Sequence, residues 1–261
     1  DHGKRPRECL YADQQGFVNG IAQKRFAREC LPYRQTGRKA PSGFHFNLGG
    51  LNMNTGGHKA IAVIGEGITE KYYVESLRVF AGNNFQIVPK QLGIKASSLD
   101  ELERAVQNAI EEGYDEVYCL IDMDSKEKGA SVQKYGKLKG KYHGKHFVKK
   151  KKGVDCQVSF IETRRCLELW FVYYFEYVTR HFASYKEVEN FLHKFVADYD
   201  KHERYFRSVG NLHKKILDCG GDLKRAIGNA RKSLVELERT GSPDASYSEM
   251  CNFFNALGIK E

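Results

Sequence analysis

The stretch Ala60-Ile-Ala-Val-Ile-Gly65 decides the fold. It is a short apolar run with β-branched residues and a glycine at its end, which is typical of a buried strand. A second run of this kind, Glu116-Val-Tyr-Cys-Leu-Ile-Asp122, follows further along the chain. Between the two runs we expect helices over residues 69–80 and 98–113, with a strand over residues 85–88 between them. Strand–helix–strand–helix–strand in this order predicts a parallel α/β sheet flanked by helices.

The second half of the chain has a different character. A fourth strand is expected over residues 156–161, after which apolar and aromatic residues recur at helical spacing. These helical patterns cover residues 164–178, 185–199, 211–219, 222–238 and 246–257. We therefore expect residues 59–162 to form an α/β core, and residues 163–261 to form a mostly helical part of the same domain that packs on the sheet.

The first part of the chain, residues 1–58, shows no sustained period of a strand or a helix and is rich in turn-forming residues. We expect a poorly structured, basic N-terminal extension here. Met53 stands just before the first patterned strand and is a candidate for the native start, with the upstream part disordered or extraneous. The alternative is a basic arm that binds nucleic acid.

The net charge of +9 is unevenly distributed. Residues 1–59 contribute +6 and residues 126–152 contribute +10, which leaves −7 for the rest of the chain. An acidic body with two basic segments fits a partner that carries phosphates. We therefore expect a nucleic acid as partner, and the sequence leaves RNA and DNA open.

Several classes of protein are not favoured by this sequence. No apolar run approaches the roughly 20 residues that cross a bilayer, and no signal-peptide core stands at the beginning, so we expect a cytoplasmic protein without a membrane partner. The seven cysteines include no CxxC pair, which argues against a zinc site or a disulfide framework. The chain also lacks the G-x-x-x-x-G-K-[ST] loop of an ATPase.

Acidic residues follow two of the expected strands. Glu66 comes directly after the first strand, while Asp122 and Asp124 end the third strand and begin its loop. Ligands collect outside the carboxyl ends of parallel strands, so these side chains meet at one edge if the two strands are neighbours. Three converging carboxylates predict a site for Mg²⁺ or Mn²⁺. The alternative is that the acids only cap helices or face water.

Three segments together resemble the RloB family. They are Ile64-Gly-Glu-Gly-Ile-Thr-Glu-Lys-Tyr-Tyr73, Cys119-Leu-Ile-Asp-Met-Asp124 and Arg165-Cys-Leu-Glu-Leu-Trp-Phe-Val-Tyr-Tyr-Phe175. Tyr199-Asp-Lys201 further resembles a later Y-x-K motif of the family. The resemblance spans about residues 60–257 and implies a TOPRIM-like domain linked to bacterial anti-phage and restriction loci.

The resemblance also implies roles for individual acids. Glu66 would be a metal ligand or general acid/base, and Asp122 and Asp124 would be the metal-binding pair. Glu70 matches the second acid of the first motif and would be a further metal ligand, although the first turn of a helix also favours an acid for its dipole. Glu168 matches the acid of the third motif and would be a further catalytic residue, since in so apolar a helix a carboxylate needs a partner or a metal.

A basic segment leaves the edge of this predicted site. Residues 125–153 are rich in Gly, Lys and Tyr, and we expect a loop whose lysines hold phosphates and whose aromatic rings stack on bases. The alternative is a solvated surface loop without a ligand. The candidate nucleic-acid-binding residues are Lys137, Lys139, Lys141, Tyr142, Lys145, Lys149 and Lys150.

These observations favour a divalent-metal-dependent nuclease that cleaves RNA or DNA. The family resemblance implies an abortive-infection effector that works with a partner ATPase of the AAA type. A different class is a non-catalytic subunit that binds nucleic acid or an ATPase in a defence complex. The number of copies, including a homo-oligomer, is left open by the sequence.

Overall fold

A computed structural model describes residues 59–81, 86–91, 98–149, 153–178 and 180–259. The chain divides into two units, Asp1–Gly49 and Gly50–Glu261, and all described residues belong to the second unit. The predictions for residues 1–58 and for Lys150 concern residues outside the described part.

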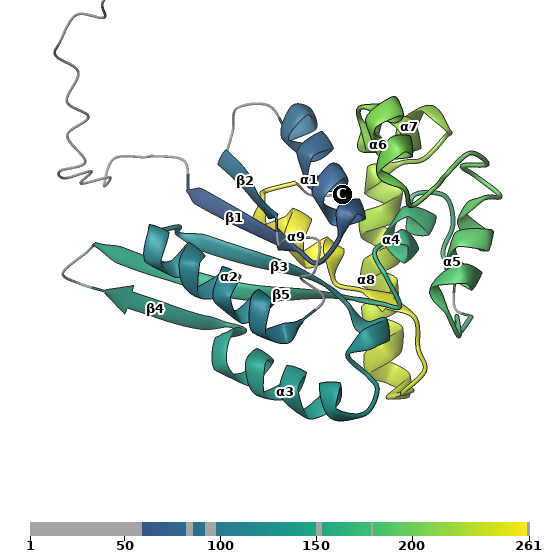
Figure 1. Ribbon diagram of the computed structural model, residues 1–261. Coiled ribbons are helices and arrows are strands. Elements are labelled where there is room, and N and C mark those ends of the chain that lie inside the picture. Colours follow the sequence, from purple (N-terminus) through teal and green to yellow (C-terminus); the bar gives the residue numbers. More distant parts are fainter. Residues whose placement is uncertain (1–58, 82–85, 92–97, 150–152, 179, 260–261) are drawn as a thin grey trace, which may run out of the picture. The chain divides into compact units, whose positions relative to one another are not determined.

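The described chain is built on one mixed sheet (Figure 1). Its strands lie in the order β2-β1-β3-β5-β4, and β1 pairs in parallel with both β2 and β3, as β3 does with β5. Strands β4 and β6 both pair antiparallel with β5. The strand bounds are β1 (Ala60–Gly65), β2 (Gln86–Gln91), β3 (Glu116–Asp122), β4 (Lys145–Lys149), β5 (Val154–Arg164) and β6 (Tyr247–Ser248). The predicted α/β fold with a mostly parallel sheet is confirmed.

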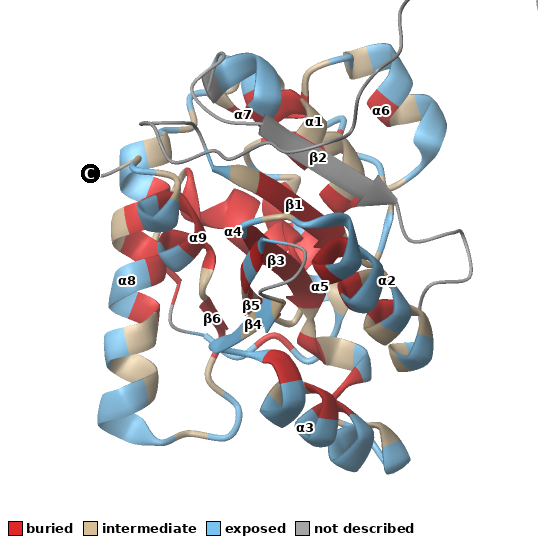
Figure 2. Cartoon of the chain, turned by 90° about the vertical axis from the view of Figure 1, so that its left-hand side faces the viewer, coloured by how far each residue is buried: buried red, intermediate tan, exposed pale blue. Residues whose placement is uncertain are grey.

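Helices cover both faces of the sheet, with α2 and α3 together on one side (Figure 1). The side chains of β1 alternate, so that Ile61 and Val63 pack with α1 and the C-terminal helices, while Ala62 and Ile64 pack with α2 and α3. Figure 2 shows the buried residues gathered along β1 and β3 between these layers. The bounds are α1 (Ile68–Ala81), α2 (Leu99–Glu112), α3 (Ala130–Tyr142), α4 (Glu168–Tyr173), α5 (Tyr185–Leu192), α6 (Glu203–Val209), α7 (Leu212–Asp218), α8 (Leu223–Thr240) and α9 (Met250–Ala256).

Helix α2 illustrates why the sequence of the first half predicts its structure well. The Ser98 side chain accepts a hydrogen bond from the Glu101 N–H, and Gly113 ends the helix in the left-handed conformation with φ of 85°. Both signals are local and lie beside a regular apolar face. No helix of the described part is long and apolar enough to cross a membrane.

Two predicted boundaries in the sheet region are wrong. The sequence places the end of the second strand before Pro89, but β2 runs on to Gln91, because it is an edge strand that tolerates a residue without an N–H. The helix predicted over residues 164–178 is much shorter, since Arg164 still belongs to β5 and α4 covers only Glu168–Tyr173. Apolar residues in a fully buried segment do not reveal whether they belong to a strand or a helix.

The basic loop predicted over residues 125–153 is also wrong. A short 3₁₀ turn, η2 (Met123–Ser125), is followed by α3 and by β4. Tyr135, Leu138 and Tyr142 are buried and lie at helical spacing, so they hold α3 against the sheet. The many lysines between them conceal this apolar face in the sequence.

Helix α3 is also held by a buried charge. The Glu162 carboxylate on β5 accepts hydrogen bonds from Tyr135 Oη (2.5 Å), Lys139 Nζ (2.5 Å) and Tyr247 Oη (3.0 Å). We expect Tyr135→Phe to lower the free energy of unfolding by about 1–3 kcal/mol, because a hydrogen bond to a buried charge is lost. Denaturant unfolding measures this change, and a variant as stable as the parent would contradict the role given to the hydroxyl.

Candidate functional site

The predicted acids are carried by three adjacent parallel strands. Glu66 follows β1, Asp122 ends β3, Asp124 lies in η2, and Glu168 begins α4 just after β5. Since β3 pairs in parallel with both β1 and β5, the carboxyl ends of the three strands meet at one edge of the sheet. The strands that precede these acids are therefore neighbours, as a shared acidic site requires.

Glu66 is paired with a lysine that the sequence analysis did not single out. Lys126 Nζ donates to Glu66 Oε2 (2.9 Å) and to Ser125 Oγ (2.9 Å). Burial raises the pKa of the Glu66 carboxyl above its ordinary value, and the Lys126 ammonium partly offsets this effect. Glu66 is therefore a largely buried carboxylate, with its side chain 11% exposed, and its charge depends on a neighbouring cation.

Glu168 joins three other parts of the chain. Its Oε1 accepts hydrogen bonds from Thr69 Oγ1 (3.1 Å) and Tyr199 Oη (2.8 Å), and Lys201 Nζ lies 3.3 Å away. The side chain of Glu168 is fully buried, whereas that of Lys201 is 32% exposed. The acid of the third motif is thus in contact with the first motif and with both ends of the Y-x-K segment.

Glu70 lies in the same region and is 2% exposed. Burial and the nearby Glu168 raise the pKa of Glu70 to about 7, although Lys201 acts in the opposite direction. A Cβ atom at Gly65 would collide with the Glu70 Cβ, and one at Gly67 would come within 2.9 Å of Glu70 Oε2. The two glycines around Glu66 therefore make room for Glu70.

Asp122 and Asp124 differ in their surroundings. Asp122 Oδ1 accepts a hydrogen bond from the Leu167 N–H (2.9 Å), and burial together with Glu70 and Glu168 raises the pKa of Asp122 well above its ordinary value. Asp124 is only partly buried, and its N–H donates to the Arg165 carbonyl (3.1 Å). Asp124 thus lies at the outer rim of the acidic region.

We refer to Glu66, Glu70, Asp122, Asp124 and Glu168 as the acidic cluster. Among the described residues, no group of three or more His, Cys, Asp or Glu side chains is arranged to hold a metal ion. Two oxygens, Glu70 Oε2 and Glu168 Oε2, are nevertheless buried without a hydrogen-bond partner in this part of the chain. Carboxylate oxygens are the donors that Mg²⁺ and Mn²⁺ prefer, so the acidic cluster fits such an ion by its chemistry. Lys126 and Lys201, which pair with Glu66 and Glu168, occupy part of the space around these carboxylates.

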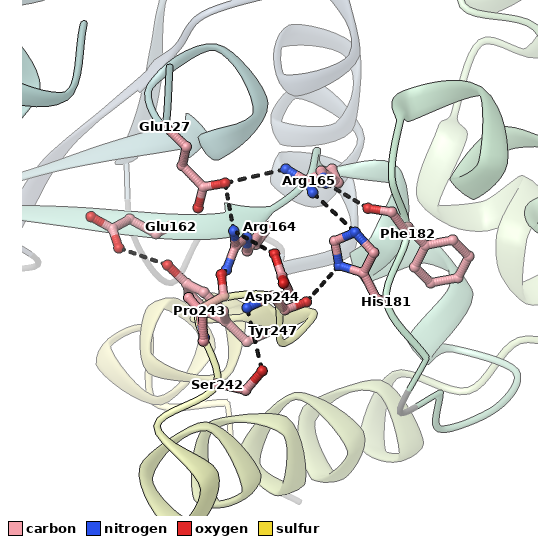
Figure 3. A network of polar contacts seen from close by, with 10 residues as sticks. All are labelled: Glu127, Glu162, Arg164, Arg165, His181, Phe182, Ser242, Pro243, Asp244 and Tyr247. Carbon is pink, nitrogen blue, oxygen red and sulfur yellow. Dashed lines mark hydrogen bonds and ion pairs between the residues drawn. The ribbon is translucent and has the colours of Figure 1, made fainter. Parts of the chain in front are cut away.

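A network of polar contacts lies beside the acidic cluster at the end of β5 (Figure 3). Glu127 accepts from Arg164 (2.8 Å) and Arg165 (3.2 Å), and Arg165 also contacts His181. His181 Nδ1 in turn donates to the Asp244 carbonyl (2.7 Å), which fixes its tautomer as long as Nε2 accepts from Arg165. The network ties the turn after Asp124 to the loops before α5 and after α8.

The described members of the predicted nucleic-acid-binding set differ in burial and pairing. Tyr142 is buried and bonded to Gln107 and Glu103, so its ring is not offered to a base. The lysines differ as well: Lys137 and Lys145 are exposed, whereas Lys139 pairs with Glu162, Lys141 with Glu103 and Lys149 with Glu111.

A smaller basic surface remains on α3. Lys134, Lys137 and Lys141 lie on one side of the helix and, with Glu103 and Asp100 of α2, border a pocket of about 230 Å³. This α3 lysine face is an exposed, one-sided basic surface within the predicted basic segment.

Four residues of the site were not among the predicted site residues. They are Thr69, Lys126, Tyr199 and Lys201, which contact Glu66 or Glu168. The sequence did offer hints to three of them: Lys126 is two residues from Asp124, and Tyr199 and Lys201 belong to the segment that resembles a family motif. The sequence does not reveal that Lys201 packs against Glu168, because that contact is formed only in the folded chain.

The sheet order and the acidic cluster define an α/β protein with a mostly parallel sheet and buried carboxylates at its carboxyl edge. The chain matches the model of the RloB-like protein family over residues 61–257, and it belongs to this family. The predicted family is therefore confirmed. Comparisons with curated proteins and with solved structures gave no match.

Proposed function

We propose that the protein is a TOPRIM-type, divalent-metal-dependent nuclease that hydrolyses phosphodiester bonds. The observation that carries this proposal is the acidic cluster, whose carboxylates lie at the shared carboxyl edge of three neighbouring strands. Two buried oxygens of the cluster, Glu70 Oε2 on α1 and Glu168 Oε2 on α4, lack a partner among the described residues. Buried acids with raised pKa values are a feature of functional sites. An arrangement with no function would leave these charges exposed or fully paired.

The residues divide into two groups by what they would do. Glu66, Asp122, Asp124 and Glu70 would hold Mg²⁺ or Mn²⁺, which when bound stabilises the charge of a phosphate under attack and makes a water more acidic. Glu168 is held by Thr69, Tyr199 and Lys201, so it would position the cluster and its water rather than move freely.

The α3 lysine face would bind the backbone of a nucleic-acid strand near the acidic cluster. Lys134, Lys137 and Lys141 point away from the sheet on a helix that begins five residues after Ser125. Lysines attract phosphates of any sequence, and such binding weakens steeply with salt. We propose RNA or DNA as substrate, an anti-phage role in the cytoplasm, and an AAA-type ATPase as partner. The family resemblance and the basic segments support this part of the proposal.

The test is cleavage by the full chain. We expect labelled tRNA, single-stranded DNA or duplex DNA to be cut with Mg²⁺ or Mn²⁺ and to stay intact with EDTA. Glu66→Gln removes one carboxylate of the cluster and should abolish cutting, while Glu203→Gln changes an exposed glutamate of α6 and should not. Cleavage that survives both EDTA and Glu66→Gln would refute the proposal.

A second function is favoured by one observation. Lys126 and Lys201 already neutralise part of the acidic cluster, which is what a subunit without metal chemistry would need. Such a subunit would bind nucleic acid or an ATPase without cutting. It is the better description if nucleic acid binds with a steep salt dependence, Mg²⁺ and Mn²⁺ have no effect, and no cleavage occurs.

A further inference from the structure

Lys126 is buried to an extent that is unusual for a lysine. Its side chain is 3% exposed, whereas lysines almost always keep their ammonium in water unless it is paired. The Nζ atom contacts Glu66 Oε2 and Ser125 Oγ, both at 2.9 Å. The proposed chemistry does not use this ammonium. It nevertheless forms an ion pair with Glu66, a carboxylate that the metal would need.

We propose that Lys126 is a built-in competitor of the divalent cation. The ammonium neutralises Glu66 in the metal-free protein and has to withdraw before Glu66 can bind an ion. This inference rests on the proposed function, because it concerns the regulation of the same site. It predicts that Lys126 sets the affinity for the metal rather than the identity of the substrate.

The chain around Lys126 allows the side chain to move by itself. The Lys126 N–H donates to the Met123 carbonyl (3.1 Å), which closes the η2 turn. On the other side, Glu127 is held by Arg164 and Arg165 (Figure 3). Because the backbone is tied on both sides, withdrawal means rotation of the flexible lysine stem, while Asp124 keeps its place.

The direction of the effect follows from the charges. An ammonium on Glu66 repels a divalent cation that approaches the same oxygens, and this repulsion is strong where water is excluded. Replacement of Lys126 by a neutral side chain removes the competitor and leaves Glu66 without a counterion. A divalent cation then gains both a free carboxylate and the removal of a like charge.

The experiment measures Mn²⁺ binding to the full chain, by calorimetry or from the electron paramagnetic resonance of free Mn²⁺. We expect Lys126→Gln and Lys126→Met to bind Mn²⁺ at least about tenfold more tightly than the parent, the size of a modest charge interaction. Glutamine can still donate a hydrogen bond to Glu66, so this variant protects the fold. Lys128→Met removes the same charge from an exposed position two residues away and should bind like the parent.

A thermal-unfolding readout accompanies the titration. Mn²⁺ should raise the melting temperature of Lys126→Gln more than that of the parent, because tighter binding to the native state gives a larger stabilisation. Binding by both Lys126 variants that is no tighter than that of Lys128→Met overturns the inference and leaves the nuclease proposal in place. If neither the parent nor any variant binds Mn²⁺, or if binding persists in Glu66→Gln at full strength, the metal site itself is refuted.

Discussion

Asp122→Asn is expected to lower metal-dependent cleavage by at least about 1000-fold, which corresponds to about 4 kcal/mol of transition-state stabilisation. Asp122 stands at the end of the central strand β3, between Glu66, which follows β1, and Glu168, which begins α4 after β5. Asparagine keeps the shape and can still accept from the Leu167 N–H, so only the charge is removed. The measurement is kcat/KM with Mn²⁺, beside the affinity for Mn²⁺.

Stability separates this loss from simple unfolding. The pKa of Asp122 is raised well above its ordinary value, so the folded protein disfavours the charged form at neutral pH. Asp122→Asn should therefore be at least as stable as the parent at pH 7 in denaturant unfolding. Asp155→Asn, which changes an exposed acid at the start of β5, should leave both cleavage and stability nearly unchanged. Undiminished cleavage by Asp122→Asn would end the assignment of this cluster as an active site.

The part of the site that was predictable is the part that depends on local patterns. The strands around Glu66 and Asp122 are short apolar runs, and once both are parallel and adjacent their ends share an edge. The family resemblance pointed to Glu168 as a site residue. The apolar residues around it would otherwise indicate only a core helix. The counterions were missed because pairing between residues 66 and 126, or 168 and 201, is decided by tertiary packing.

Helix α3 shows a second reason for failure. Its buried residues Tyr135, Leu138 and Tyr142 are three among thirteen, and four lysines and two glycines are interspersed with them. Charge and glycine content favoured a loop, while the helix is stabilised by a narrow apolar face and by the buried Glu162. In α4 the sequence overestimated the helix instead. The segment from residue 167 to 174 is apolar except for Glu168, so it carries no periodic signal that marks where a helix begins or ends.

Lys201→Met is expected to destabilise the protein by about 2–4 kcal/mol at pH 8. Lys201 is the cation nearest to Glu168, and burial, which would lower its pKa, is outweighed by Glu168, Asp122 and Glu70, so that the pKa of Lys201 is raised. Removal of one partner of a buried pair typically costs about 3–5 kcal/mol, and we expect less here because the lysine is partly exposed to water.

The loss should depend on pH in a defined direction. The pKa of Glu70 is about 7 in the folded protein against 4.5 when unperturbed, so its protonated form is favoured by folding. The stability that such a group contributes is fully present below pH 4.5 and is lost as the pH rises through about 7. Because Lys201 lowers the pKa of Glu70, its removal raises this pKa further and extends the loss of stability to higher pH. The deficit of Lys201→Met relative to the parent should therefore shrink between pH 8 and pH 5.

Two controls make the comparison specific to the acidic cluster. Lys224→Met removes an exposed lysine of α8 and should change the free energy of unfolding by less than about 0.5 kcal/mol at both pH values. Addition of Glu168→Gln to Lys201→Met should recover part of the stability, because the carboxylate that lost its counterion is then neutral. A deficit of equal size at pH 5 and pH 8, unaffected by Glu168→Gln, would mean that Lys201 acts through packing of its stem and not as the counterion of the cluster.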